Sequence, residues 1–368
     1  MKKNIFNSAI ILLIALFFST CSLDYDYPPE HSFTLGPINI VDYPSSSTHY
    51  IKDWLPDGKL IPVKKGSNWQ LFWAEKVDIL TEASTPWPED HAGQLTLENE
   101  VYGKKNENNV VDKITDFNEI TDFNENGSWF IGIFPLNDSG KYVGFYHAES
   151  HRDDKGTAHK SIGVTYSDNY GKTWHGSAPI IVDTQTKSES TGWSGLGDGC
   201  VIYDKDNKRW LCYYQGKVSG AQNSICLAMS DDPEATSGTW KKWNGGSFSV
   251  EAYNPETKKG GANHALSNLR LRPGANPSVM WNTYLNKWVM VYHGWNPKKV
   301  YIAFSKDGIN WGNPSTVIGG ADNPIWYPNL ISTEGDLVGG KEVRLYFSYQ
   351  QDPSNGKRKL AYCTLTFN

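Results

Sequence analysis

The fold is decided by a nine-residue stretch, YSDNYGKTW (166–174), that recurs twice in altered form. The second version is MSDDPEATSGTW (229–240), and the third is FSKDGINW (304–311). All three end a short apolar run and place Asp, Gly and Trp in the same order. A sequence that repeats itself in this way is built from copies of one supersecondary unit, so the copies have to be found first.

Each version follows two apolar runs of the same kind. They are KYVGFYHAES and HKSIGVTYSD before the first, RWLCYYQGK and NSICLAMSDD before the second, and KWVMVYHGW and KKVYIAFSKDG before the third. Two further copies lack the stretch: WQLFWAEK with VDILTEAS near residue 75, and EVRLYFSYQQ with KRKLAYCTLTFN at the end. Short β-branched and aromatic runs separated by turn residues are typical of antiparallel strands.

Five copies of a three- or four-stranded unit predict an all-β fold, a five-bladed β-propeller. A sheet this small cannot bury both of its faces alone, so the copies are expected to pack around an axis. We predict one propeller domain over 33–368, with no helix longer than two turns. The last copy lacks a fourth strand, and FTLGPINIVDYP (33–44) is predicted to supply it and close the ring.

The opening stretch resembles the Asp box of sialidase-type propellers, S-x-D-x-G-x-T-W, through Asp168, Gly171, Thr173 and Trp174. The Asp is expected to accept backbone N–H bonds across a turn, the Gly to supply a positive φ, and the Trp to cover the blade edge. The motif joins the third strand of each copy to the fourth, on the face opposite the entrances to the inner strands. We therefore interpret it as architecture.

Composition points to a carbohydrate partner. The 368 residues carry a net charge of -5, without the basic excess that is typical of nucleic-acid binding. Aromatic residues make up 13% of the chain, and their flat rings suit both β-structure and stacking on sugars. We expect a monomer that binds carbohydrate and no nucleic acid.

The sequence opens with MKKNIFNSAIILLIALFFSTC (1–21), in which two Lys precede an apolar run and small residues end at Cys21. The run is too short to span a bilayer and is typical of a secretory signal. It resembles a bacterial lipoprotein signal, in which the Cys is lipidated. We predict a signal peptide over 1–20, a tether over 21–32, and a lipid anchor on Cys21 at the outer membrane. An ordinary signal peptide or a simple membrane anchor is the alternative.

The remaining cysteines match no metal-site spacing. They are Cys200, Cys212, Cys226 and Cys363. If a hairpin turns at DKDNKR, Cys200 lies opposite Tyr213 and Cys212 opposite Val201. We therefore expect buried free thiols and no disulfide between these two strands.

Side chains suited to binding and cleaving carbohydrate gather where inner strands begin and where the following strands end. The candidates are Asp198, Asn276 and Trp326 at the entrances, Glu75, His147, Glu149, His151, His293 and Trp295 at the exits, with Trp129 and Arg272 beside them. The histidines are expected to be hydrogen-bonded wall residues. No metal or other cofactor is expected, although a structural cation at the axis stays open.

The pattern of Asp or Asn before Gly or Pro at the inner strands (GDG, 197–199; NPSV, 276–279) resembles five-bladed propeller glycoside hydrolases. These include the arabinanase and xylosidase type (family 43) and the fructosidase type (family 32). Asn276 takes the place of an Asp, and an amide cannot act as a base, so the family-43 catalytic residues do not carry over as a set. Sialidases share the Asp box, but they need six blades, one more than predicted here, and a triad of arginines that grips the sialate carboxylate. This chain has only six arginines in all, so a sialidase is not predicted.

The resemblance implies hydrolysis of a polysaccharide or oligosaccharide by two carboxyl groups at the central funnel, one protonated and one ionised. Asp198, between two glycines, is predicted to stay ionised. Glu149 is predicted to lie next to it across a blade boundary and to act as the general acid, with Glu75 as the third candidate. Similarity to the arabinanase type implies inversion. The alternative is a non-catalytic cell-surface glycan-binding lipoprotein, which Asn276 favours.

Overall fold

A computed structural model describes residues 28–40, 58–65, 68–72, 127–151, 157–171, 173–218, 223–295, 299–319, 324–332, 337–352 and 357–368. Within them the only helices are two short 3-10 turns, Lys187–Glu189 and Leu269–Leu271, so the all-β prediction is confirmed. No helix among these residues is long and apolar enough to cross a membrane. The predicted signal peptide, Cys21 and Glu75 lie outside the described residues.

Four sheets of five strands contain most of the described chain. The first consists of β5 (Gly127–Pro135), β6 (Tyr142–His151), β7 (Ala158–Ser167), β8 (His175–Ile181) and β9 (Ser194–Gly195). The second consists of β10 (Gly197–Asp204), β11 (Arg209–Gly216), β12 (Ser224–Ser230), β13 (Lys241–Trp243) and β14 (Phe248–Glu251). The third consists of β15 (Gly274–Asn282), β16 (Lys287–Gly294), β17 (Lys299–Ser305), β18 (Ser315–Gly319) and β20 (Val338–Gly339). The fourth consists of β19 (Ile325–Ser332), β21 (Glu342–Asp352), β22 (Lys357–Phe367), β1 (Phe33–Leu35) and β2 (Asn39–Ile40).

The copy near residue 75 is present only as a hairpin of β3 (Ile61–Lys65) and β4 (Asn68–Phe72). Its next predicted run, VDILTEAS, lies outside the described residues. Five complete blades are therefore not observed: the described chain contains four blade-sized sheets and one two-stranded sheet.

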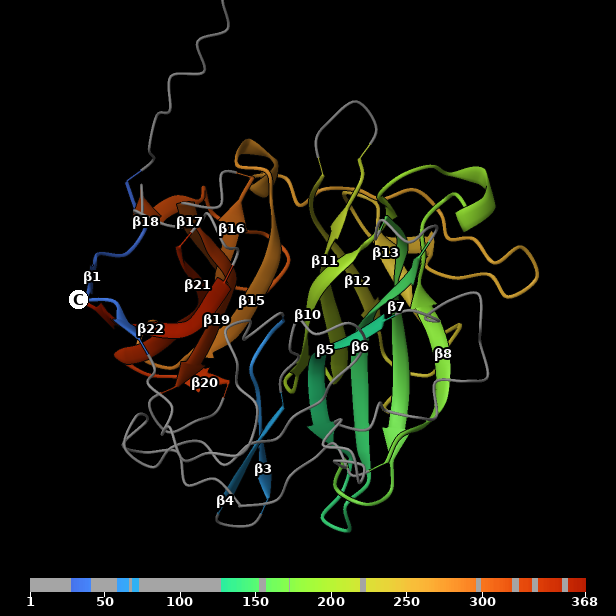
Figure 1. The fold of residues 1–368 in the computed structure, drawn as a ribbon, viewed down its shortest axis with the longest axis horizontal. Coiled ribbons are helices and arrows are strands. Elements are labelled where there is room, and N and C mark those ends of the chain that lie inside the picture. The colour runs from blue at the N-terminus through green and yellow to red at the C-terminus, as the bar shows by residue number, and fades with distance from the viewer. Residues whose placement is uncertain are drawn as a thin grey trace, which may run out of the picture.

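The sheets are arranged as in a propeller, with β5, β10, β15 and β19 toward the centre and β8, β18 and β1 at the outer edges (Figure 1). Neighbouring inner strands contact one another, β3 with β5, β5 with β10, β10 with β15, and β15 with β19. Buried side chains of adjacent sheets fill the space between them, for example Phe145 of β6 with Val201 of β10 and Cys212 of β11. Each sheet thus buries the face that it could not bury alone.

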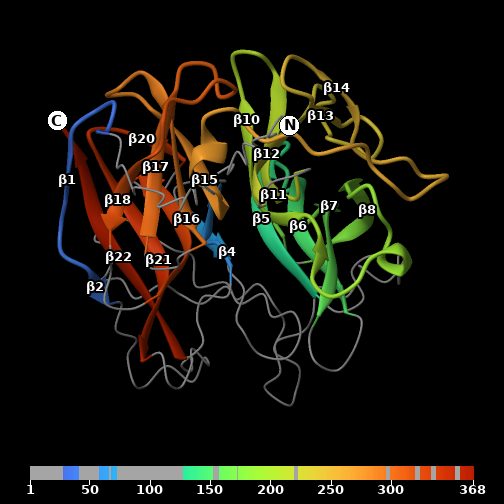
Figure 2. The ribbon, with the colours of Figure 1, turned by 90° about the horizontal axis from the view of Figure 1, so that it is seen from above.

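The N-terminal strand joins the last sheet as predicted. Phe33 of β1 lies opposite Phe367 of β22, and Leu35 lies opposite Leu365, in antiparallel register. Figure 2 shows β1 running beside β22 at the edge of the molecule. The first and last described strands of the chain therefore share one sheet.

The repeated stretch is a turn between the third and fourth strands, but its acceptor residue differs from the predicted one. Asn169, not Asp168, accepts the backbone N–H of Thr173 at 2.9 Å. Asp168 is exposed, and its carboxylate lies 2.7 Å from Nε2 of His175. The acceptor follows two residues after Ser167, whose hydroxyl accepts the Gly171 N–H at 2.9 Å. The prediction for Asp168 was wrong by one position.

The third version shows the same geometry with an Asp. Asp307, two residues after Ser305, accepts the N–H groups of Ile309 and Asn310 at 2.9 and 2.7 Å. The glycines of both turns have a positive φ, 79° at Gly171 and 74° at Gly308. The closing Trp residues of all three versions are buried. These Trp side chains, Trp174, Trp240 and Trp311, are part of the hydrophobic core.

The cysteine predictions are confirmed. Cys200 lies opposite Tyr213 and Cys212 lies opposite Val201. The four cysteines of the described residues are buried and free.

Candidate active site

Three innermost strands share the same irregularity where they enter the centre. Asp198, Asn276 and Tyr327 have φ values of 49°, 54° and 53°. Each lies at a β-bulge of its strand, in β10, β15 and β19 respectively. A non-glycine residue with positive φ costs on the order of 1–3 kcal/mol, and such residues gather at functional sites. The internal repeat therefore places three strained positions at equivalent points around one centre.

Asp198 forms an ion pair with Lys160 of the neighbouring sheet. Lys160 Nζ donates to Asp198 Oδ2 at 2.9 Å, and both side chains are largely buried. Burial opposes ionisation of the carboxyl group, but the charge of Lys160 holds its pKa well below the ordinary value. Lys160 therefore favours the ionised form of Asp198.

His147 connects the backbone of Asp198 to the side chain of Glu149. Its Nδ1 accepts the backbone N–H of Asp198 at 3.0 Å, and its Nε2 lies 3.1 Å from Glu149 Oε1. Since Nδ1 is an acceptor, the ring proton lies on Nε2 and is donated to Glu149. Gly197 permits this approach, because a Cβ there would lie 2.0 Å from Nδ1. The predicted proximity of Asp198 and Glu149 is thus mediated by one imidazole ring.

A second, uncharged pair lies on the third sheet. Asn276 Nδ2 is 3.4 Å from Nε2 of His293. Burial lowers the pKa of His293 to about 4, although the charge of Asp198 opposes this. His293 is therefore a neutral ring at neutral pH. It lies in edge-to-face contact with Trp326, with ring centroids 5.4 Å apart.

Lys59, just before β3, reaches the same region. The residue is 4% exposed, and Nζ lies 3.4 Å from the backbone oxygen of Asn276. Burial lowers the pKa of Lys59 to about 8, while charges at Cys200 and Asp198 act in the opposite direction. The hairpin thus contributes a buried ammonium group to the centre of the molecule.

The other predicted residues are more dispersed. The Trp129 ring lies 5.5 Å from that of His147. Trp295 is 45% exposed, and its Nε1 donates to the backbone oxygen of Asn223 at 3.2 Å. Arg272 Cζ lies 6.0 Å from the centre of the Tyr301 ring. The backbone of His151 belongs to β6, and its side chain is not among those described.

Sequence reasoning missed Lys160, Lys59, Tyr327 and the exposed Trp193. A signal for Lys160 was available, because the β6–β7 hairpin places it directly opposite Glu149. The other three gave no comparable signal, since their positions depend on how separate sheets pack. Among the described residues, no group of three or more His, Cys, Asp and Glu side chains is arranged to hold a metal ion.

The comparisons with known proteins support the fold. No protein-family profile and no curated protein matches the sequence. Among solved structures, the chain resembles Zg3597, a family 117 glycoside hydrolase of the marine bacterium Zobellia galactanivorans. Identity is 16% and the TM-score is 0.53, with 91% of this chain and 90% of that chain covered.

A second similar structure is the endo-1,5-α-L-arabinanase of Thermotoga petrophila. It is 13% identical with a TM-score of 0.50, over 85% of this chain and 71% of that chain. At such identities the likeness establishes a shared fold. The expected resemblance to propeller glycoside hydrolases is confirmed at that level.

Proposed function

We propose that the protein is a glycoside hydrolase that cleaves a polysaccharide or oligosaccharide at the centre of the propeller. The observation that carries the proposal is the His147 bridge, in which one imidazole ring is hydrogen-bonded both to the backbone N–H of Asp198 and to the Glu149 carboxyl group of another sheet. Two carboxyl groups from different backbone elements are what glycoside hydrolysis requires. The fold shared with known propeller glycoside hydrolases supports the same function.

In the proposed reaction, Asp198 acts as the base and Glu149 as the acid. Lys160 keeps Asp198 ionised, so its carboxylate can accept a proton from the attacking water. Glu149 in its protonated form gives its proton to the glycosidic oxygen as the bond to the anomeric carbon breaks. His147 holds both groups in position. Whether the anomeric configuration is inverted stays a prediction from the arabinanase resemblance.

A glycan-binding protein without hydrolytic activity is the second candidate. Asn276, a residue that cannot act as a base, has the same backbone conformation as Asp198 in the next inner strand. Exposed indoles at Trp193 and Trp295 would stack on sugars whether or not cleavage follows.

The ring and the cellular location belong to the same proposal. We propose a complete five-bladed ring, which is supported by the 2.7 Å hydrogen bond from Asn329 of β19 to the backbone oxygen of Leu60, next to β3. We also propose that Cys21 is lipidated and anchors the protein in the outer membrane, as the leader sequence predicts.

A polysaccharide panel separates the two candidates. Purified protein is incubated with arabinan, pectin, agarose, alginate and chondroitin sulfate, and reducing ends and affinity are measured together. Asp198→Asn and Glu149→Gln are each expected to lower turnover by a factor on the order of 10² or more while binding persists. Binding of a glycan with no products would select the binding protein, and near-normal turnover in either variant would remove that residue from the mechanism.

A further inference from the structure

An exposed tryptophan stands beside the Asp198–Lys160 ion pair. Trp193 is 60% exposed, the largest fraction among the exposed large apolar residues of the described chain. Lys160 Nζ lies 5.8 Å from the centre of the Trp193 ring and 2.9 Å from Asp198 Oδ2. One ammonium group therefore adjoins both the indole and the carboxylate.

The segment before Trp193 is anchored at several points. The Thr186 N–H donates to Glu189 Oε2 at 2.9 Å, and Lys259 pairs with the other carboxylate oxygen of Glu189 at 2.5 Å. Lys187 Nζ donates to the hydroxyl of Ser150 in β6 at 2.7 Å. These contacts tie the 3-10 turn both to the first sheet and to the loop after β14.

The segment after Trp193 is held by β7. Ser194 and Gly195 form β9, which pairs in parallel with His159 and Lys160. The His159 ring is hydrogen-bonded to the Ser194 hydroxyl at 3.0 Å. Gly195 has φ 82°, and a Cβ there would lie 2.0 Å from the Lys160 carbonyl oxygen. Trp193 thus extends from a support that is fixed on both sides.

A single exposed apolar side chain is ordinary on a protein surface. Trp193 differs because its support is built from many contacts and still leaves the largest apolar side chain type in water. Full burial of an aromatic side chain removes on the order of 150–250 Å² from solvent, and the 60% of Trp193 that is exposed leaves the larger part of such an area open to a ligand. A ligand that covers the indole would recover that gain, and the apolar C–H face of a sugar ring has the required shape and chemistry.

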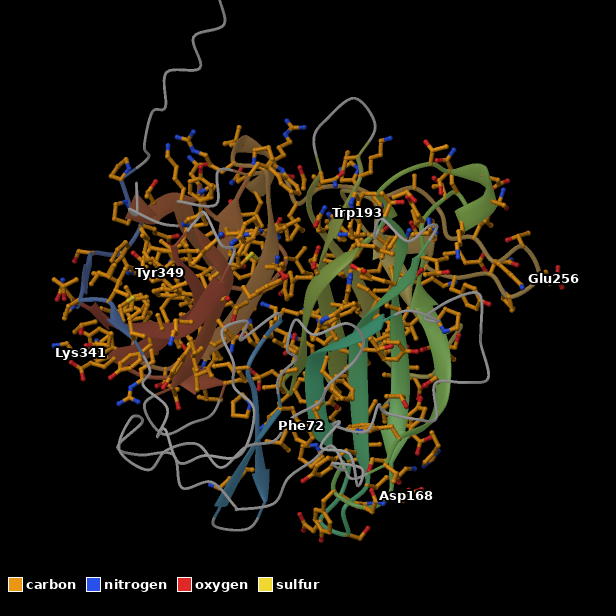
Figure 3. All side chains as sticks on the ribbon, viewed as in Figure 1. Phe72, Asp168, Trp193, Glu256, Lys341 and Tyr349 are labelled. Carbon is orange, nitrogen blue, oxygen red and sulfur yellow. The ribbon has the colours of Figure 1, made fainter. Side chains whose placement is uncertain are left out.

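Trp193 also lies at the correct end of the strands. In Figure 3 it is far from Asp168, which marks the opposite end of β7. The inner strand β10 begins within a few residues of it, at Gly197. A sugar on the indole would therefore adjoin a sugar held at Asp198.

We propose that Trp193 forms a subsite for the sugar unit next to the one held between Asp198 and Glu149. The indole stacks on the face of that sugar, and Lys160 lies within reach of its hydroxyl groups. The subsite rests on the proposed function, and it specifies that the ligand is a chain of at least two sugars. Because of Trp193, the affinity for a sugar chain and the kcat/KM for its cleavage should therefore increase with the number of sugar units.

The test uses ladders of two to six sugars from arabinan, β-1,3-galactan, agarose and chondroitin, with the full-length protein. Calorimetry gives Kd, and reducing-end assays give kcat/KM for each length. In the ladder that binds, we expect wild type to bind the longer oligosaccharides about tenfold more tightly than the shortest one that binds. Trp193→Ala should bind all lengths with the affinity of that shortest oligosaccharide. Trp193→Phe, which retains a stacking face, should restore most of the gain with chain length.

Tyr284→Ala is the matched control, because Tyr284 is 49% exposed and lies in the β15–β16 turn, away from the strand entrances. It should leave the dependence on chain length unchanged. If Trp193→Ala keeps the gain with chain length, or lowers affinity equally for all lengths, the subsite is refuted and the proposed function stands. A wild-type protein that binds none of the ladders would refute both.

Discussion

The buried ammonium of Lys59 should destabilise the folded protein at neutral pH, and its removal should be stabilising. The pKa of Lys59 falls from 10.5 to about 8 because of burial. That difference corresponds to about 3 kcal/mol between the charged and neutral forms, at about 1.4 kcal/mol per pKa unit. Within the part of the chain that the structure describes, Nζ makes one hydrogen bond, to the Asn276 oxygen, which is long at 3.4 Å and offsets little of this cost. Lys59→Met is therefore expected to unfold at higher urea concentration than wild type at pH 7.

The contribution of Lys59 to the free energy of unfolding should increase with pH. The folded state releases the Lys59 proton near pH 8, whereas the unfolded state holds it until about pH 10.5. Between these values the unfolded state binds more protons, so the contribution of Lys59 to the free energy of unfolding rises with pH. Between pH 7 and pH 9.5 this contribution should rise by about 2 kcal/mol. The advantage of Lys59→Met over wild type should shrink by the same amount.

Lys242 provides a contrast within the same chain. It is also fully buried, and burial lowers its pKa to about 8 as well. However, its Nζ donates to the backbone oxygens of Val182 and Gly261, both at 2.7 Å, and to Asn263 Oδ1 at 2.9 Å. Lys242→Met would leave three acceptors without this donor and should destabilise the protein by about 3–5 kcal/mol at pH 7.

Urea unfolding followed by tryptophan fluorescence at pH 7 and pH 9.5 checks both lysines. The exposed Lys205, replaced by Met, serves as a control that should leave the pH dependence of wild type unchanged. Titration of the buried Tyr side chains contributes equally to wild type and variants, so it cancels in the difference. Parallel stability curves for wild type and Lys59→Met between the two pH values would refute the reasoning.

Three further predictions concern the site, the thiols and the leader. Gly197→Ala would place a Cβ 2.0 Å from His147 Nδ1 and should lower turnover by about 10²-fold. Gly340→Ala is the control, because a Cβ there would have no atom within 4 Å, and it should leave turnover unchanged. Equal turnover in the two variants would contradict the role of the His147 bridge. Burial raises the pKa of Cys226 and of Cys363 to about 12. Neither thiol should therefore react with a disulfide reagent until the protein is unfolded by urea, and rapid reaction of the native protein would disprove their burial. Cys21→Ser should move the protein from the membrane fraction to the soluble fraction of the cells, and unchanged membrane association would rule out lipidation.

Local pattern was enough to predict most strands of the four described sheets and the register of the β10–β11 hairpin. The opposite positions of Cys200 and Tyr213 follow from the turn between two strands, because a hairpin fixes register through its loop. The addition of β1 to β22 was predicted from the missing fourth strand of the last copy. These features depend on neighbours in sequence or on the count of repeats.

Contacts between sheets were harder to predict. Lys160 meets Asp198 only because β7 and β10 approach each other across a sheet boundary. Lys59 reaches Asn276 from a hairpin more than 200 residues away in sequence. The prediction of Asp168 as the turn acceptor also failed, because Asn169 accepts the bond instead; both residue types form such turns, and a shift of one position changes the assignment.

The three strained inner positions explain why the proposed acid and base come from different kinds of element. Asp198, Asn276 and Tyr327 share one backbone conformation, yet only Asp198 carries a carboxylate. Lys160 holds that carboxylate ionised, so it cannot also be the proton donor. His293 is neutral and buried at neutral pH, which leaves it without a proton to release as an acid near pH 7. A donor then has to come from a strand exit, and Glu149 is the exit carboxyl group that His147 connects to Asp198.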